Sequence, residues 1–292
     1  MAEAARRIVN EAPVFTPLTP NIGCRVEGID IAAPMSDAVF AALRRALAEH
    51  TVLVLPDQTL TPEQHIAFSR RFGPLEDHVL SDFCLDGHPE IFVVSNIVEN
   101  GRHVGAYGGS KRYHSDLSYM EKPSLGSLFY CLECPQGSGQ TAFVSMAAAF
   151  EALPVDTQAR LLGLNGVHDY VWNYARAHTA RPPLTEAQKA QTPPVVHPAV
   201  RSHPETGRKS LFISEVFTRT FEGEDEEESR KLITELMTFA ERPEFVYVHE
   251  WTPGDLLIWD NRSSVHKAMR FDEENARRRM HRTTVQGDRP FR

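Results

Sequence analysis

The chain has 292 residues, of which 41 % are hydrophobic and 24 % are charged, as in an ordinary globular protein with a large buried core. Its formal net charge of −8 argues against a nucleic-acid-binding or membrane-surface protein, because both classes need a basic face to meet phosphates. We find neither a secretory leader nor a run of about 18 apolar residues, so we expect no export by the usual route and no membrane span.

The first half of the chain predicts short strands that alternate with helices. Residues 1–20 are polar and contain proline, so we expect a frayed or weakly docked start. Ser36 can cap a helix over residues 36–50, and Thr61 and Gln64 form a capping box with a proline at the first helical position. Strands are expected over residues 23–30, 51–55 and 90–96.

The second half predicts further strands, two presumptive loops beside them and one long helix. Residues 99–112 are rich in glycine and polar residues, which is typical of a loop that covers a site. Residues 175–194 are rich in proline and lack periodicity, so we expect an insertion or lid between strands. An acidic run leads a helix that ends near Arg242. Shorter helices are expected after Ser145 and up to Leu162, and strands over residues 125–132, 141–144, 195–213 (as a hairpin), 245–251 and 256–259.

The four cysteines, Cys24, Cys84, Cys131 and Cys134, lack the spacing of a disulfide framework. Cys131 and Cys134 form a CxxC pair, but no second pair and no thioredoxin-like context accompany it. We therefore expect buried thiols in a protein of the reducing cytoplasm.

One short stretch suggests a metal site. Of three His-x-Asp/Glu triplets, two have proline at the middle position, which marks a turn or a strand edge. The third, His114-Ser115-Asp116, lies among strand-compatible residues, and in a strand its two outer side chains project from one face about 7 Å apart. One distant histidine would complete the two-His-one-carboxylate triad of non-haem iron enzymes. On the triplet alone, a histidine beside an unrelated aspartate remains the alternative.

Several ordered motifs together resemble the TauD/TfdA family of Fe(II)- and 2-oxoglutarate-dependent dioxygenases. The resemblance runs from about Gly23 to Pro290 and implies a single domain over residues 1–292. The implied fold is mainly β, a double-stranded β-helix or jelly-roll (cupin-like) barrel flanked by helices. The motifs are His114-Ser115-Asp116, the Thr141 strand, Trp259-Asp260-Asn261-Arg262 followed by His266, and Arg278-Arg279-Met280-His281-Arg282.

The resemblance implies a role for individual residues. His114, Asp116 and His266 look like the iron ligands. Arg278 resembles the residue that pairs with the distal carboxylate of 2-oxoglutarate, since a guanidinium offers two parallel donors and stays charged when desolvated. Thr141 matches the hydroxyl donor to the same carboxylate, with an ordinary strand threonine as the alternative.

Further residues match substrate positions of the family. Arg282 corresponds to the residue that meets the anionic group of the prime substrate. His78, Tyr174 and Phe217 fall where taurine dioxygenase has a substrate-contacting histidine and aromatic walls, with structural roles as the alternative. Departures from the family pattern, such as Ser110 in place of a substrate-facing asparagine, leave the substrate open among sulfonates, sulfate esters, aryloxyalkanoates and other small carboxylates.

The implied activity is hydroxylation of a C–H bond of a small anionic substrate, with Fe(II), 2-oxoglutarate and O2, and release of succinate and CO2. We expect a cytoplasmic homo-oligomer, a dimer or tetramer, with no nucleic-acid or membrane partner. Two alternatives remain open. A zinc hydrolase on the same three ligands would leave Arg278 without a function, and a non-catalytic metal-binding sensor would form no succinate.

Overall fold

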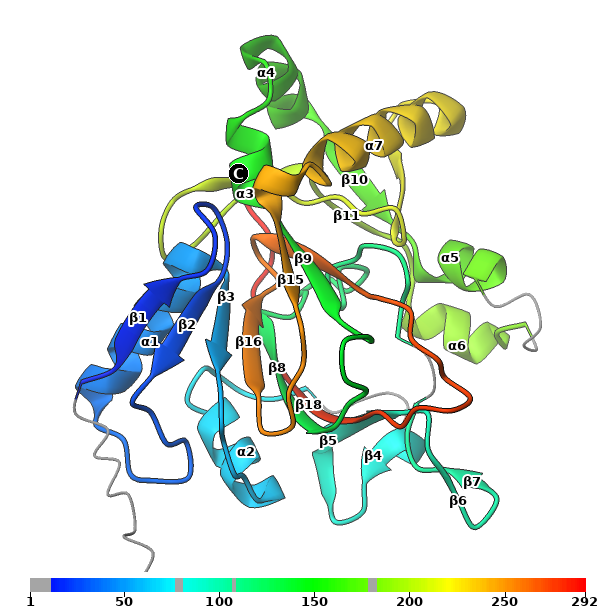
Figure 1. Ribbon diagram of the computed structural model, residues 1–292. Helices are drawn as coiled ribbons and strands as arrows, with labels where there is room; N and C mark the ends of the chain where they lie inside the picture. Colours follow the sequence, from blue (N-terminus) through cyan, green and yellow to red (C-terminus); the bar gives the residue numbers. More distant parts are fainter. Residues whose placement is uncertain (1–11, 77–80, 107–108, 178–182) are drawn as a thin grey trace, which may run out of the picture.

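The structure is a computed structural model that describes residues 12–76, 81–106, 109–177 and 183–292. Strands dominate it and helices lie at its periphery (Figure 1), so the expectation of a mainly β protein with flanking helices is confirmed. The strands of the described residues form separate sheets, and no closed barrel occurs among them. None of the helices in these residues combines the length and apolarity that a bilayer crossing requires.

The largest sheet has eight strands in the order β1-β2-β3-β16-β8-β18-β5-β4. All neighbours in it are antiparallel except β2 and β3. Its strands, in that order, are β1 (Val14–Pro17), β2 (Cys24–Glu27), β3 (Val52–Leu55), β16 (Leu256–Asp260), β8 (Gly126–Glu133), β18 (Arg279–Val285), β5 (His88–Ser95) and β4 (Cys84–Leu85).

A three-stranded sheet, β15-β9-β17, faces the large one. The remaining strands form a three-stranded sheet, β11-β10-β14, and two hairpins, β12-β13 and β6-β7. These strands are β15 (Val246–His249), β9 (Thr141–Ser145), β17 (Ser264–Ala268), β11 (Val195–Pro198), β10 (Asn165–His168), β14 (Thr218–Phe221), β12 (Val200–Ser202), β13 (Lys209–Leu211), β6 (Val98–Glu99) and β7 (Arg102–His103).

Helices cover the outer faces of the two facing sheets. Figure 1 shows α1 beside β1–β3, with α3, α4 and α7 at the top of the view. The helices are α1 (Asp37–His50), α2 (Pro62–Ser69), α3 (Met146–Glu151), α4 (Val155–Gly163), α5 (Tyr170–Ala177), α6 (Glu186–Gln191) and α7 (Glu226–Ala240), with 3-10 turns η1 (Ser81–Phe83) and η2 (Pro243–Phe245).

The hydrophobic core follows the alternation of side chains along the strands. On β16, Leu256 and Ile258 pack with Leu43 of α1 on the outer face, whereas Leu257 and Trp259 point to the interior between the sheets. On β9, Ala142 and Val144 pack against residues of α3 and α7 on the outer face of the small sheet, and Phe143 points to the interior. The order of layers is therefore helix, large sheet, small sheet, helix, with the site between the sheets.

Most predicted elements occur near their expected positions. Ser36 accepts from Val39 N at the start of α1, and Thr61 and Gln64 form the expected capping box of α2. The hairpin predicted over residues 195–213 occurs only as β12 and β13, because β11 pairs with β10 instead.

Two local expectations were wrong. Residues 14–17 form β1 at the edge of the large sheet, although we expected a frayed start, and residues 1–11 lie outside the described part. The stretch expected as an insertion or lid contains α6, which has its own capping box, and this helix does not contradict that expectation. Residues 112–119 do not form a strand, because His114 lies in an isolated bridge and Leu117 adopts a φ of +56° within a turn.

Candidate functional site

Three side chains from two distant parts of the chain meet between the two sheets: His114, Asp116 and His266. Each offers one metal-ligand atom, and these atoms lie within 4.8 Å of one another. His114 Nε2 is 3.9 Å from Asp116 Oδ1, and His266 Nε2 is 3.9 Å from Asp116 Oδ2. The ring centroids of the two histidines are 4.3 Å apart. The structure thus brings together the three residues that the sequence singled out.

Backbone pairing directs the two histidines to the same place. His266 lies on β17 opposite Phe143 of β9, and cross-strand partners share a face, so its imidazole points to the interior. Its ring centroid is 4.7 Å from that of Trp259 on the large sheet. His114 and His266 exchange two backbone hydrogen bonds of 3.0 and 2.8 Å. This long-range bridge, and not a continuous strand, fixes the position of His114.

Asp116 is held by partners from several elements. Ser127 Oγ, on β8, donates to Asp116 Oδ2 at 2.9 Å, and Arg282 Nη1, on β18, donates to Asp116 Oδ1 at 3.2 Å. The backbone N–H of Asp116 donates to Asn261 Oδ1 at 3.3 Å, and its carbonyl accepts from Ser124 Oγ at 3.0 Å. Because each carboxylate oxygen has a donor of its own, the carboxylate has a fixed orientation toward the histidines.

The local electrostatics favour the protonation states that bind a metal. Burial opposes ionisation of Asp116, but the Arg282 guanidinium and the two imidazoles together hold the pKa of this carboxyl well below its ordinary value. Burial lowers the pKa of His266 to about 3 and also lowers the pKa of His114. His114 Nδ1 lies 3.1 Å from the carbonyl of Arg112, and a proton donated there leaves the Nε2 lone pair unprotonated. At neutral pH the three residues are an anion and two neutral imidazoles, the donor set that suits Fe(II).

Asn261 organises the turn that carries Asp116, a role that the sequence did not reveal. Besides accepting from Asp116 N, its Oδ1 accepts from Trp259 Nε1 at 3.0 Å, and its Nδ2 donates to Ser124 Oγ at 2.8 Å. Its carbonyl accepts from Ser115 Oγ at 2.9 Å. The only signal in the sequence was its place in the motif before His266, and apart from Trp259 the partners named here, Ser115, Asp116 and Ser124, lie more than 130 residues away in the chain.

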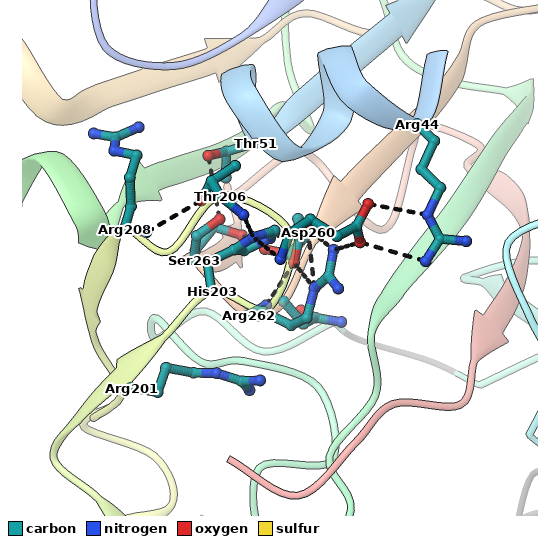
Figure 2. A network of polar contacts seen from close by, with 12 residues as sticks. Arg44, Thr51, Arg201, His203, Thr206, Arg208, Asp260, Arg262 and Ser263 are labelled. Carbon is teal, nitrogen blue, oxygen red and sulfur yellow. Dashed lines mark hydrogen bonds and ion pairs between the residues drawn. The ribbon is translucent and has the colours of Figure 1, made fainter. Parts of the chain in front are cut away.

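A buried ionic network supports the other residues of the same motif, and Figure 2 shows its members together. Asp260 is fully buried, accepts from His203 Nε2 at 3.0 Å and forms an ion pair with Arg262 at 2.6 Å. Arg262 also pairs with Glu205, which in turn accepts from Arg44 of α1. Burial would raise the pKa of Asp260, but Arg262 and His203 hold it well below its ordinary value. The network fixes the turn between β16 and β17 and hence the strand that carries His266.

Arg278 and Thr141 are connected through two aromatic side chains, Phe129 and Trp251. Arg278 is 6 % exposed, and its Nε has no hydrogen-bond partner in the described part of the chain. Its guanidinium carbon is 5.6 Å from the Phe129 ring centroid, and that ring is 5.5 Å from Trp251. Trp251 Nε1 donates to Thr141 Oγ1 at 3.0 Å, so the hydroxyl hydrogen of Thr141 can donate elsewhere. A buried guanidinium with an unpaired N–H fits an anionic ligand such as a carboxylate of 2-oxoglutarate.

The predicted substrate-facing residues are placed at different distances from the triad. The Phe217 ring is 6.3 Å from His114. Tyr174, on α5, is two rings beyond Phe217, because its ring packs 6.1 Å from that of Tyr170, which in turn is 6.4 Å from Phe217. His78 lies outside the described residues.

Tyr119 and Tyr170 extend this aromatic wall, and the sequence had given neither a role. The Tyr119 ring centroid is 4.7 Å from both Tyr170 and Phe217. Tyr119 also lines a cavity of about 400 Å³ whose wall is mixed, with Met120 and Val195 beside charged residues such as Glu121 and Arg289. A hydrophobic, aromatic surface therefore adjoins the side of the triad that Phe217 covers.

Comparisons with known proteins agree with this geometry. The family model described as "Taurine catabolism dioxygenase TauD, TfdA family" matches residues 15–284. The chain is 35 % identical over 288 residues to an alpha-ketoglutarate-dependent 2,4-dichlorophenoxyacetate dioxygenase of Cupriavidus pinatubonensis, covering 94 % of this chain and 98 % of that protein. It is also 35 % identical over 285 residues to an (S)-phenoxypropionate/alpha-ketoglutarate-dioxygenase of Sphingobium herbicidovorans, covering 95 % and 96 %.

Two solved structures are similar over nearly the whole chain. One is AAD-2 in complex with Mn(II) and N-oxalylglycine, with a TM-score of 0.80, 31 % identity and coverage of 96 % of this chain and 99 % of that chain. The other is a taurine dioxygenase from Burkholderia xenovorans, with a TM-score of 0.78, 30 % identity and coverage of 95 % and 92 %.

Proposed function

This chain belongs to the TauD, TfdA family and is a 2-oxoglutarate-dependent non-haem iron dioxygenase of small anionic substrates, and from that premise we propose which residues carry the reaction and which substrate it takes. His114, Asp116 and His266 hold Fe(II) on one face. The convergence of these three ligand atoms within 4.8 Å, in the protonation states that a metal needs, is the observation that carries the proposal. When bound, iron together with 2-oxoglutarate and O2 supplies the oxidising chemistry.

Arg278 and Thr141 bind the distal carboxylate of 2-oxoglutarate. The guanidinium is buried and has an unpaired N–H in the described residues, and the Thr141 hydroxyl has already accepted one hydrogen bond and retains its own hydrogen to donate. The protein thereby orients the cosubstrate and keeps its carboxylate away from water.

We propose an aryloxyalkanoate as the prime substrate. Arg282 would pair with its carboxylate, and the guanidinium is already oriented by its hydrogen bond to Asp116. The rings of Phe217, Tyr119 and Tyr170 form an apolar wall against which an aryl group can pack. A small aliphatic sulfonate has no aromatic group that would use this wall. The two relatives named above, which act on aryloxyalkanoates, support the same choice.

A substrate panel tests the activity and the substrate together. Purified protein is supplied with Fe(II), 2-oxoglutarate and O2, and succinate release is measured with an aryloxyacetate, a 2-aryloxypropionate, taurine and an alkyl sulfate. We expect succinate and a phenol from the aryloxyalkanoates and little from taurine. Turnover of taurine alone would contradict the aryloxyalkanoate proposal. Phenol release without O2 would indicate a hydrolase, and metal binding without succinate would indicate a sensor.

We further propose that the chain folds as a single jelly-roll domain and forms a cytoplasmic homo-oligomer. The two facing sheets that enclose the site support the jelly-roll. Exposed apolar side chains on α4, Val155 and Leu162, are of the kind that a subunit interface buries. Analytical ultracentrifugation tests the oligomeric state, and a single cooperative unfolding transition is expected for one domain.

A further inference from the structure

Asn96, the residue directly after β5, holds the segment that precedes Arg278. Its Nδ2 donates to the carbonyls of Glu273 and Ala276 at 2.8 and 2.7 Å. Its Oδ1 accepts from the backbone N–H of Arg278 at 2.8 Å. One partly buried side chain therefore satisfies three backbone groups of residues 273–278.

These bonds fix the backbone from which the Arg278 side chain extends. The pairing of β5 with β18 ends at Ser95 opposite Arg279, so Asn96 and Arg278 lie one residue beyond it. Asn96 N donates to the carbonyl of Arg278 at 3.3 Å, and the Asn96 side chain accepts from the N–H of Arg278. The backbone of Arg278 is thus held on both sides by a single residue, directly before its side chain enters the interior.

Other contacts shape the rest of the segment. Asp272 caps its turn through Oδ1, which accepts from the N–H groups of Glu274 and Asn275 at 3.2 Å. Lys111 Nζ donates to Glu273 Oε1 at 2.7 Å at the outer side. A small cavity between this segment and β5 is lined by both Asn96 and Arg278. Glu273 and Lys111 line the same cavity, but Asn96 is the residue whose side chain bonds directly to the backbone of Arg278.

We infer that Asn96 is a positioning residue for 2-oxoglutarate, which it serves by fixing Arg278. The inference rests on the proposed role of Arg278 and deepens it. Asn96 makes no contact with the metal ligands, so its loss should weaken cosubstrate binding without disturbing the metal or the prime substrate. A merely structural asparagine would affect all of these properties together.

The experiment compares Asn96→Ala with the wild type, with Arg278→Ala as the reference for the proposed function. The dissociation constant of 2-oxoglutarate is measured by calorimetry on the Mn(II)-loaded protein, and KM for both substrates, kcat and the ligand-free melting temperature are measured in parallel. For Asn96→Ala we expect 2-oxoglutarate binding to weaken about tenfold, with kcat and the KM for the prime substrate within about twofold of wild type. Asn96→Ser, which keeps one hydrogen-bonding group, carries the test if the alanine variant does not fold.

Asn275→Ala is the matched control, because within the described residues the Asn275 side chain bonds only to Asp272 of the same segment. It should bind 2-oxoglutarate like the wild type. Two results for the Asn96 variant would overturn the inference without contradicting the proposed role of Arg278. One is unchanged 2-oxoglutarate binding. The other is a lower kcat, a higher KM for both substrates and a lower melting temperature, all by similar degrees. Unchanged binding in Arg278→Ala would instead overturn the proposed function.

Discussion

Arg282 contacts a candidate metal ligand, since its Nη1 donates to Asp116 Oδ1 at 3.2 Å, and we propose that it also binds the prime substrate. We expect Arg282→Ala to raise the KM for the prime substrate about a hundredfold, because the carboxylate of the bound substrate would lose its charged partner in a desolvated site. The KM for 2-oxoglutarate should change far less, because Arg278 is the residue proposed to bind it. Steady-state kinetics with each substrate varied in turn measures both.

Arg279→Ala is the control for this variant. Arg279 lies on the same strand but pairs with Glu99 and Glu133 outside the site. It should leave the KM for the prime substrate near the wild-type value. Equal increases in both KM values for Arg282→Ala would show that Arg282 does not bind the prime substrate.

Ser127 orients Asp116 through the hydrogen bond to Oδ2, so we expect Ser127→Ala to weaken metal binding. Loss of a hydrogen bond to a ligating carboxylate typically reduces metal affinity about 10- to 100-fold. Titration of the metal-free protein with Mn(II) or Fe(II) measures the change. Ser210→Ala, at a buried serine of β13 whose hydroxyl donates to the carbonyl of Leu211, should bind metal like the wild type. Equal losses in both variants would argue against a specific role of Ser127.

At the scale of single residues, the sequence identified the triad but not its geometry. The pair His114 and Asp116 was predicted from the two-residue period of a strand, whereas the structure uses a bridge to His266 and a turn at Leu117. Partners such as Ser127 and Asn261 could not be inferred, because their hydrogen bonds to Asp116 depend on loops and strands brought together only by the fold.

At the scale of elements, β8 and β16 approach so closely at Gly126 that a side chain there has no room. A Cβ atom at this position would lie 2.3 Å from the carbonyl oxygen of Trp259. We expect Gly126→Ala to destabilise the protein by about 2 kcal/mol or more, since backbone must move to relieve the overlap. Metal affinity should fall as well, because Ser127 is the next residue on β8. Denaturant unfolding and metal titration measure the two effects.

Gly163→Ala serves as the comparison for this variant. Gly163 ends α4, and a Cβ atom there would meet nothing within 4 Å. This substitution should leave stability unchanged or raise it slightly, because alanine favours the helix. Equal stability of the two variants would show that the contact between β8 and β16 relaxes without cost.

The helices were easier to predict than the sheets. The starts of α1 and α2 depend on capping residues that are neighbours in the sequence, so Ser36 and Thr61 sufficed to place them. The sheet β11-β10-β14 was not anticipated, because its pairing joins strands more than 25 residues apart and β11 was instead assigned to a hairpin.

At the scale of the whole molecule, several histidines are buried as neutral groups. Burial lowers the pKa of His65 and His168 to about 3 and that of His197 and His281 to about 4. The unfolded chain, with histidine pKa values near 6.5, therefore binds more protons than the folded protein below that pH. The contribution of these histidines to the free energy of unfolding is fully present above about pH 6.5 and is lost as the pH drops toward 4. At pH 5 the loss is about 2 kcal/mol for each such histidine.

Urea unfolding of His168→Gln at pH 7.5 and pH 5 tests this expectation. The variant lacks one titrating group, so its loss of stability between the two pH values should be about 2 kcal/mol smaller than that of the wild type. His50→Gln, at the end of α1, should keep the wild-type difference. If His168→Gln lost as much unfolding free energy between pH 7.5 and pH 5 as the wild type, protonation of His168 would not be a cause of the acid sensitivity.

The backbone bridge between His114 and His266 has a consequence for reconstitution. Because main-chain hydrogen bonds already join the two imidazole-bearing residues, the coordination geometry is preorganised by the polypeptide and does not have to be created by the ion. A chelator should therefore yield a folded apoprotein that regains activity on simple addition of ferrous salt, unlike small zinc domains whose folding and metal uptake are one process.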